Sequence, residues 1–124
     1  MRAGRFTKVF RLGRDRDFKH VFSVRHRRES GPLLVYGAPN DLGHARLGLS
    51  VSRKVGGAIA RNRVKRHLRE SFRQSDGKNA AFDFVVVVRP HGAMKADAYQ
   101  RHLDRVMQKV TDEWTGPPAS QHAD

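Results

Sequence analysis

The feature that most restricts how this chain can fold is its longest apolar run, which extends from Phe84 to Val88. The run contains four consecutive valines, and Pro90 follows shortly after it. β-Branched residues favour strands, and a strand that is apolar on both sides is typical of a position buried on both faces of a sheet. We therefore expect a central strand over residues 82–88. The run is far too short to cross a membrane, so we expect no membrane partner.

Periodicity and chain breakers predict the remaining elements. Apolar residues at helical spacing indicate a helix at 15–27, and a helix without internal Gly or Pro is expected at 58–74. An alternating pattern predicts a half-buried strand at 46–52, with Gly48, Ser50 and Ser52 on its outer face. A strand at 33–36 and a helix at 97–114 complete the set.

The expected order is α-β-β-α-β-α, in which an antiparallel pair is followed by a helix and a further strand. The economical solution is an α+β fold, a two-layer sandwich with a small mixed sheet. A sheet this small is expected to have only one face covered by helices. The other face could be left open, and with Gly48, Ser50 and Ser52 on it could receive the backbone of a ligand.

At 124 residues the chain is expected to form one domain, over residues 1–114, with residues 1–10 flexible. The polar segment 115–124 contains a Pro-Pro pair and is expected to be a disordered tail. The first residues lack the apolar stretch of a secretory signal, and the sequence has no cysteine. We expect a cytoplasmic protein.

Positive charge is concentrated in two segments. The formal net charge is +13; residues 1–28 carry ten Lys and Arg against two Asp, and residues 53–73 carry eight against one Glu. The segments 29–52 and 74–124 each contain one acid more than they contain Lys and Arg. A solvated face normally mixes both signs, whereas a nucleic-acid footprint gathers one sign. The distribution favours a polyanionic partner.

The helix at 58–74 has two contrasting faces. Ala60, Val64, Leu68, Ser71 and Phe72 form the apolar stripe that should pack on the sheet. The opposite face carries a row at spacings i, i+4, i+7 and i+11: Asn62, Arg66, Arg69 and Arg73. Successive members lie about 5–6 Å apart, and arginine binds phosphate bidentately. This face is predicted to contact the phosphates of a nucleic acid.

Acidic residues and histidines do not suggest chemistry by the protein itself. No two of the seven histidines stand at a metal-ligand spacing of i+3 to i+5, and the acids do not cluster as two-metal nucleases require. We therefore expect no catalytic residue, no metal site and no small-molecule substrate.

The segment Gly57 to Glu70 closely resembles the RNR signature of the protein subunit of bacterial ribonuclease P. The segment Arg46 to Val55 resembles the strand that precedes that signature in the family. Phe18, Phe22 and Tyr36 match the aromatic positions of the family's first helix and first strand. The resemblance covers roughly residues 9–110.

The resemblance implies a fold in which the RNR helix lies in a left-handed β-α-β crossover, although handedness rules favour the opposite hand. It also implies a function: the protein would bind ribonuclease P RNA and assist Mg²⁺-dependent endonucleolytic removal of the 5′ leader from precursor tRNA. The RNA would carry the chemistry and hold most of the Mg²⁺. The protein alone would be inactive.

Site residues follow from the same resemblance and from the charge pattern. The residues expected to contact the catalytic RNA are Arg61, Asn62, Arg63, Lys65, Arg66 and Arg69, with Arg73 ranked below them. Arg53 and Lys54 are also expected to contact RNA, and the alternative for them is a role in the solubility of an edge strand. The residues expected to line the leader cleft are Phe18, Phe22, Tyr36, Ser50 and Ser52. The helical spacing of Phe18 and Phe22 also fits a core role. A structural RNA-binding protein of ribosomal type is the alternative function.

Overall fold

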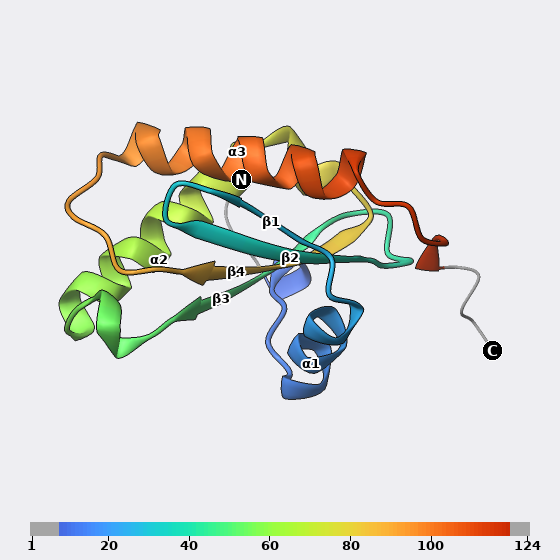
Figure 1. Cartoon of the computed structure of the whole chain (residues 1–124), viewed down its shortest axis with the longest axis horizontal. Helices are drawn as coiled ribbons and strands as arrows, with labels where there is room; N and C mark the ends of the chain where they lie inside the picture. Colours follow the sequence, from blue (N-terminus) through green and yellow to red (C-terminus); the bar gives the residue numbers. More distant parts are fainter. Residues whose placement is uncertain (1–7, 120–124) are drawn as a thin grey trace.

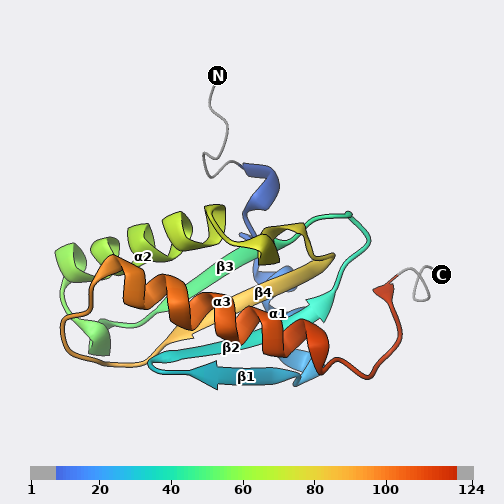
Figure 2. The same ribbon diagram turned by 90° about the horizontal axis from the view of Figure 1, so that it is seen from above.

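The computed structural model describes residues 8–119 and contains one four-stranded sheet with three α-helices (Figures 1 and 2). The helices are α1 (Asp15–Val24), α2 (Ala58–Arg73) and α3 (Ala96–Asp112). The strands are β1 (Arg27–Ser30), β2 (Leu33–Pro39), β3 (Arg46–Val51) and β4 (Phe82–Val88). The predicted α+β fold with a small mixed sheet is confirmed.

The valine-rich strand β4 lies inside the sheet, whose order is β1-β2-β4-β3. β4 pairs antiparallel with β2 and parallel with β3, so Val85 lies between Tyr36 and Gly48. The central position is as predicted, but the expected antiparallel pair formed by the strands at 33–36 and 46–52 is wrong, because β2 and β3 are not neighbours in the sheet. Helices cover the valines on both faces, since Val86 and Val88 belong to the core with α2 and α3 and Val85 to the core with α1. β4 separates β2 from β3.

The chain contains a strand that the sequence did not predict. The first helix ends at Val24 instead of residue 27, because Arg25 adopts the left-handed conformation (φ 64°). Residues 27–30 then form β1, which pairs with β2 across a turn at Gly31 (φ 56°). The observed order is α-β-β-β-α-β-α, which corrects the predicted one.

Helices lie on both faces of the sheet. In Figure 1, α3 lies above the sheet and α1 below it. The larger core, between the sheet and the pair α2 and α3, includes Leu47, Leu68 and Phe84. A smaller core under α1 includes Leu12, Val21 and Val85. The expectation that helices cover only one face is therefore wrong: α1 covers part of β2 and β4 on the other face, where Val21 and Phe22 pack in the smaller core.

The crossover from β3 through α2 to β4 places the basic helix beside the edge strand β3. In Figure 2, in which α2 and α3 lie on the near side of the sheet, β3 and β4 run in the same direction and the connection is left-handed. This agrees with what the resemblance implied and departs from the usual preference.

Parts of the predicted flexible segment 1–10 and tail 115–124 lie outside the described residues, so both stay predictions. No helix within residues 8–119 is long and apolar enough to span a membrane.

Candidate nucleic-acid interface

The outer face of α2 is set by the packing of its inner face. Val64, Leu68 and Phe72 are buried against the sheet and α3. The opposite side chains point outward as a consequence of the helical period, and Asn62 and Arg66 are exposed. The predicted division of this helix into an apolar stripe and a basic row is reproduced.

Two members of the row are less free than their spacing suggests. Arg73 is half-buried, and its guanidinium forms an ion pair with Glu70 one turn earlier. Its charge is therefore already compensated within the helix. Arg69 is also half-buried and faces a hollow beside β3.

The remaining predicted basic residues lie along the same helix or just before it. Arg63 is exposed, Lys65 is half-buried, and the Nε of the half-buried Arg61 has no hydrogen-bond partner within the described residues. Arg53 and Lys54 are exposed in the short 3₁₀ helix η2 (Arg53–Val55), which connects β3 to α2. These cations thus extend along one side of the molecule.

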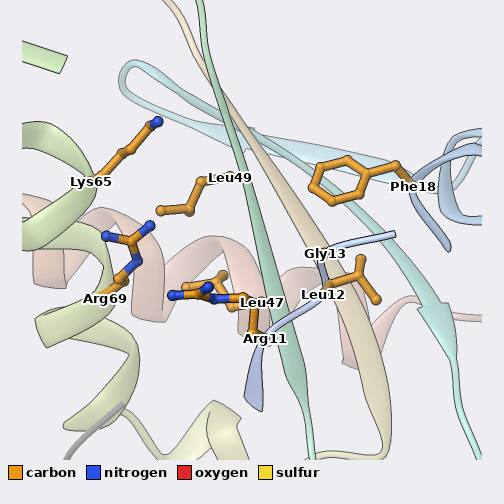
Figure 3. A pocket seen from close by; sticks show the side chains of 8 residues that line it. All are labelled: Arg11, Leu12, Gly13, Phe18, Leu47, Leu49, Lys65 and Arg69. Atoms are coloured by element: carbon orange, nitrogen blue, oxygen red, sulfur yellow. The ribbon is translucent and has the colours of Figure 1, made fainter. Parts of the chain in front are cut away.

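Three cations converge on the hollow between α2 and β3 (Figure 3). Lys65 and Arg69 enter it from α2, and Arg11 enters from the segment before α1. Burial lowers the pKa of Arg69, and the neighbouring charge of Arg11 lowers it further. No carboxylate is among the residues that line the hollow, so an anionic group would relieve the repulsion.

Arg11 is a site residue that the sequence reasoning missed. The segment carrying it runs beside β3: Arg11 forms an isolated parallel bridge with Leu47, and the Leu12 N–H donates to the Leu47 carbonyl (3.0 Å). This contact joins residues far apart in the chain, so no local pattern reports it. The excess of charge in residues 1–28 was an available signal.

The aromatic residues predicted for the leader cleft lie together on the α1 side of the sheet. The rings of Phe18 and Phe22 are 6.4 Å apart, and those of Phe22 and Tyr36 meet edge to face at 4.8 Å. All three side chains are half-buried. They pack on the smaller core and still present ring surface, so the core role and a binding role are compatible here.

The two serines behave differently. Ser50 is half-buried on the strand face that also carries Gly48, beside which the Phe18 ring lies. Ser52 lies beyond the end of β3, where its hydroxyl accepts a hydrogen bond from the Lys54 N–H (3.3 Å). Ser52 therefore caps η2, away from the aromatic cluster, and its predicted place in the cleft gains no support.

An ion pair connects the sheet to the start of α1. Arg46 donates two hydrogen bonds to the buried Asp83 (2.9 and 2.8 Å), and this interaction raises the pKa of Arg46. The Asn40 amide also donates to Asp83 (2.9 Å). Asp17 in α1 lies 3.9 Å from the same guanidinium. The network helps to position the helix that carries Phe18.

Within residues 8–119, no group of three or more His, Cys, Asp or Glu side chains gathers where it could hold a metal ion. The two carboxylates that do converge, Asp17 and Asp83, face Arg46. Within this part of the chain the arrangement supplies cations and aromatic rings, which bind nucleic acid.

Comparison with known proteins agrees with this chemistry. The family model described as Ribonuclease P matches residues 6–111. The ribonuclease P protein component of Photorhabdus laumondii is 42% identical over 85 residues, which cover 68% of this chain and 71% of that protein.

Solved structures show the same fold. The RNase P protein of Staphylococcus aureus has a TM-score of 0.71 at 33% identity, over 82% of this chain and 94% of that one. A mutant of the S. aureus protein, described as having defective mRNA degradation activity, has a TM-score of 0.73 at 31% identity, over 84% and 90%. The RNase P protein of Thermotoga maritima has a TM-score of 0.58 at 27% identity, over 86% and 98%.

Proposed function

Because this chain belongs to the ribonuclease P protein family, we propose that it binds ribonuclease P RNA and the 5′ leader of precursor tRNA. In this proposal it assists the RNA-catalysed, Mg²⁺-dependent endonucleolytic removal of the leader, which produces the mature tRNA 5′ end. The observation that carries the proposal is the placement of the basic helix α2 on one side of the edge strand β3 and of Phe18 on the other (Figure 3). Phe18 is the first ring of a half-buried aromatic cluster that continues to Tyr36 on β2.

The basic side of α2 is the proposed surface for the catalytic RNA. Asn62, Arg63 and Arg66 are exposed there without an acidic partner in the described part of the chain. Arginine side chains neutralise phosphates and release counterions, which favours binding and makes it sensitive to salt. Arg61, Lys65 and Arg69 extend this surface toward the hollow beside β3.

The aromatic side is the proposed surface for the leader. Stacking of bases on aromatic rings tolerates any sequence and contributes about 1–3 kcal/mol per base. Phe18, Phe22 and Tyr36 are suited to this because each keeps part of its ring accessible. Such tolerance is needed, since leaders differ among tRNAs.

The Mg²⁺ ions are assigned to the RNA. Phosphate oxygens are suitable Mg²⁺ ligands, whereas the converging carboxylates of this protein, Asp17 and Asp83, are directed at Arg46. The protein's contribution is charge neutralisation and substrate positioning, and we expect the isolated protein not to cleave precursor tRNA.

Reconstitution tests the proposal. Cleavage of a precursor tRNA at low Mg²⁺ is measured with a bacterial ribonuclease P RNA, with this protein, and with both together. We expect leader removal to be far faster with both than with either alone. Tight RNA binding without stimulation would favour the structural RNA-binding alternative, and cleavage of precursor tRNA or of an mRNA by the protein alone would contradict the assignment of the chemistry to the RNA.

A further inference from the structure

Arg25 occupies a backbone conformation that ordinarily favours glycine. With φ 64° and ψ 19° it ends α1, and its N–H donates to the Phe22 carbonyl (3.1 Å). Among the described residues it is the one non-glycine with positive φ. An L-residue in this conformation costs roughly 1–2 kcal/mol, so the position would be more stable with glycine. An arginine at such a position suggests that its side chain has a use.

The Arg25 side chain lines a hollow together with Phe22, Arg27 and Tyr36. The rings of Phe22 and Tyr36 meet edge to face there. Arg27 donates to the Tyr36 hydroxyl (3.1 Å), and its guanidinium carbon lies 5.8 Å from the centre of that ring. The hollow therefore combines aromatic walls with two cations.

These two cations lack acidic partners within residues 8–119, unlike their neighbours. On the same edge of the molecule, Arg28 pairs with Glu113 and Arg89 pairs with Glu29. Neither Arg25 nor Arg27 forms an ion pair in the described residues. Aromatic rings beside uncompensated arginines are the combination that binds single-stranded nucleic acid, in which bases stack and phosphates meet the cations.

We propose that this hollow is a nucleotide subsite in which Arg25 binds a backbone phosphate of the leader while the neighbouring base contacts Phe22 and Tyr36. The inference rests on the proposed function and adds Arg25, with Arg27 beside it, to the predicted leader residues. Arg25 contributes affinity and not sequence preference, because phosphate contacts are the same for every sequence.

The first test is Arg25→Gly, because it removes the side chain and also removes the backbone strain of an L-residue at positive φ. We expect the variant to unfold at the same or a higher temperature than the wild-type protein. In the holoenzyme, affinity for precursor tRNA should fall roughly three- to tenfold, while affinity for mature tRNA stays unchanged. The slope of log affinity against log salt should become shallower by about 0.7, the value for one single-stranded phosphate.

Two further variants separate charge from backbone. Asparagine tolerates the left-handed conformation and carries no charge, so Arg25→Asn should lose as much affinity for precursor tRNA as Arg25→Gly. Arg25→Lys keeps the charge and should retain most of the affinity. The matched control is Arg105→Ala, which removes an exposed arginine from α3 and should leave precursor affinity unchanged.

Neutral methylphosphonate linkages, placed one at a time along the leader, locate the contact. At one linkage, the neutral group should reduce the affinity of the wild-type holoenzyme by the same factor as Arg25→Gly reduces it on unmodified precursor tRNA. With that linkage neutral, Arg25→Gly should cause no further loss of affinity. Three results would overturn the subsite. Arg25→Gly could bind precursor tRNA as tightly as the wild-type protein does, or it could lose as much affinity for mature tRNA as for precursor tRNA. The substitution could also reduce affinity by the same factor at every neutral linkage. A wild-type holoenzyme indifferent to the leader would instead overturn the proposed function.

Discussion

The ring of Phe18 lies so close to the main chain of Gly48 that a Cβ atom at Gly48 would come within 2.6 Å of the ring's Cζ. Gly48 is on β3 and Phe18 on α1, so this contact joins the first helix to the edge strand of the sheet. The absence of a side chain at Gly48 leaves room for the ring, and Phe18 is half-buried there. The leader surface proposed above depends on this close approach.

Gly48→Ala is expected to displace the Phe18 ring. Added volume at a tight contact costs about 1–3 kcal/mol, which urea unfolding would measure. In the holoenzyme the variant should also lose part of its preference for precursor over mature tRNA. Gly92→Ala is the control, since no atom lies within 4 Å of a Cβ at that position. Unchanged stability and unchanged preference in Gly48→Ala would contradict the role given to this contact.

Arg66→Ala and Arg73→Ala should differ, although both residues belong to the predicted row. Arg66 is exposed, whereas the Arg73 guanidinium is paired with Glu70. Arg66→Ala should weaken binding to ribonuclease P RNA and reduce the salt slope by somewhat less than one, with thermal unfolding unchanged. Arg73→Ala should change both quantities less. An unfolded Arg66→Ala protein, or equal losses in the two variants, would show that the outward row is misassigned.

Sulfate should stabilise the free protein through the hollow that Arg11, Lys65 and Arg69 line. Burial and the charge of Arg11 lower the pKa of Arg69, which means that the fold disfavours its charged form. An anion bound to the native state alone raises the melting temperature by mass action. We expect a larger rise in sodium sulfate than in sodium chloride of equal ionic strength, and a smaller difference in Arg69→Gln. Equal responses of both proteins would place the anion elsewhere.

Arg46→Met should be strongly destabilising. Asp83 is buried, and the substitution leaves its carboxylate without the two hydrogen bonds from Arg46. Loss of one partner of such a pair costs about 3–5 kcal/mol, measured by urea unfolding. The exposed pair of Arg101 and Asp97 provides the comparison, because Arg101→Met should cost less than about 1 kcal/mol. Similar losses in the two variants would argue against the network.

The elements that could be predicted from the sequence are those in which local pattern and tertiary environment agree. The four valines required an internal strand, and the period of α2 separated its apolar stripe from its basic row. Strand β1 was missed because the helix before it ends at Arg25, a residue that gives no local signal of a left-handed cap.

The kind of candidate site could be predicted from the sequence, but the set of residues that form it could be predicted only in part. The basic helix and the three aromatic residues follow from composition, spacing and resemblance. Arg11 reaches the site through a contact with Leu47, and the accessible charge of Arg73 is removed by Glu70. The first fact depends on a tertiary backbone contact that no local spacing encodes. The second involves a pair at the i, i+3 spacing of helix neighbours, which the sequence does show.

The central claim is that two surfaces beside β3 bind two different RNAs, and one paired measurement tests it most directly. Affinity for ribonuclease P RNA, and holoenzyme affinity for precursor tRNAs with leaders of increasing length, are measured for Phe22→Ala and Arg66→Ala. We predict that Phe22→Ala assembles normally and loses the gain in affinity with leader length. Arg66→Ala should assemble weakly and, once saturated with RNA, keep that gain. The same pattern of losses in both variants would contradict the account.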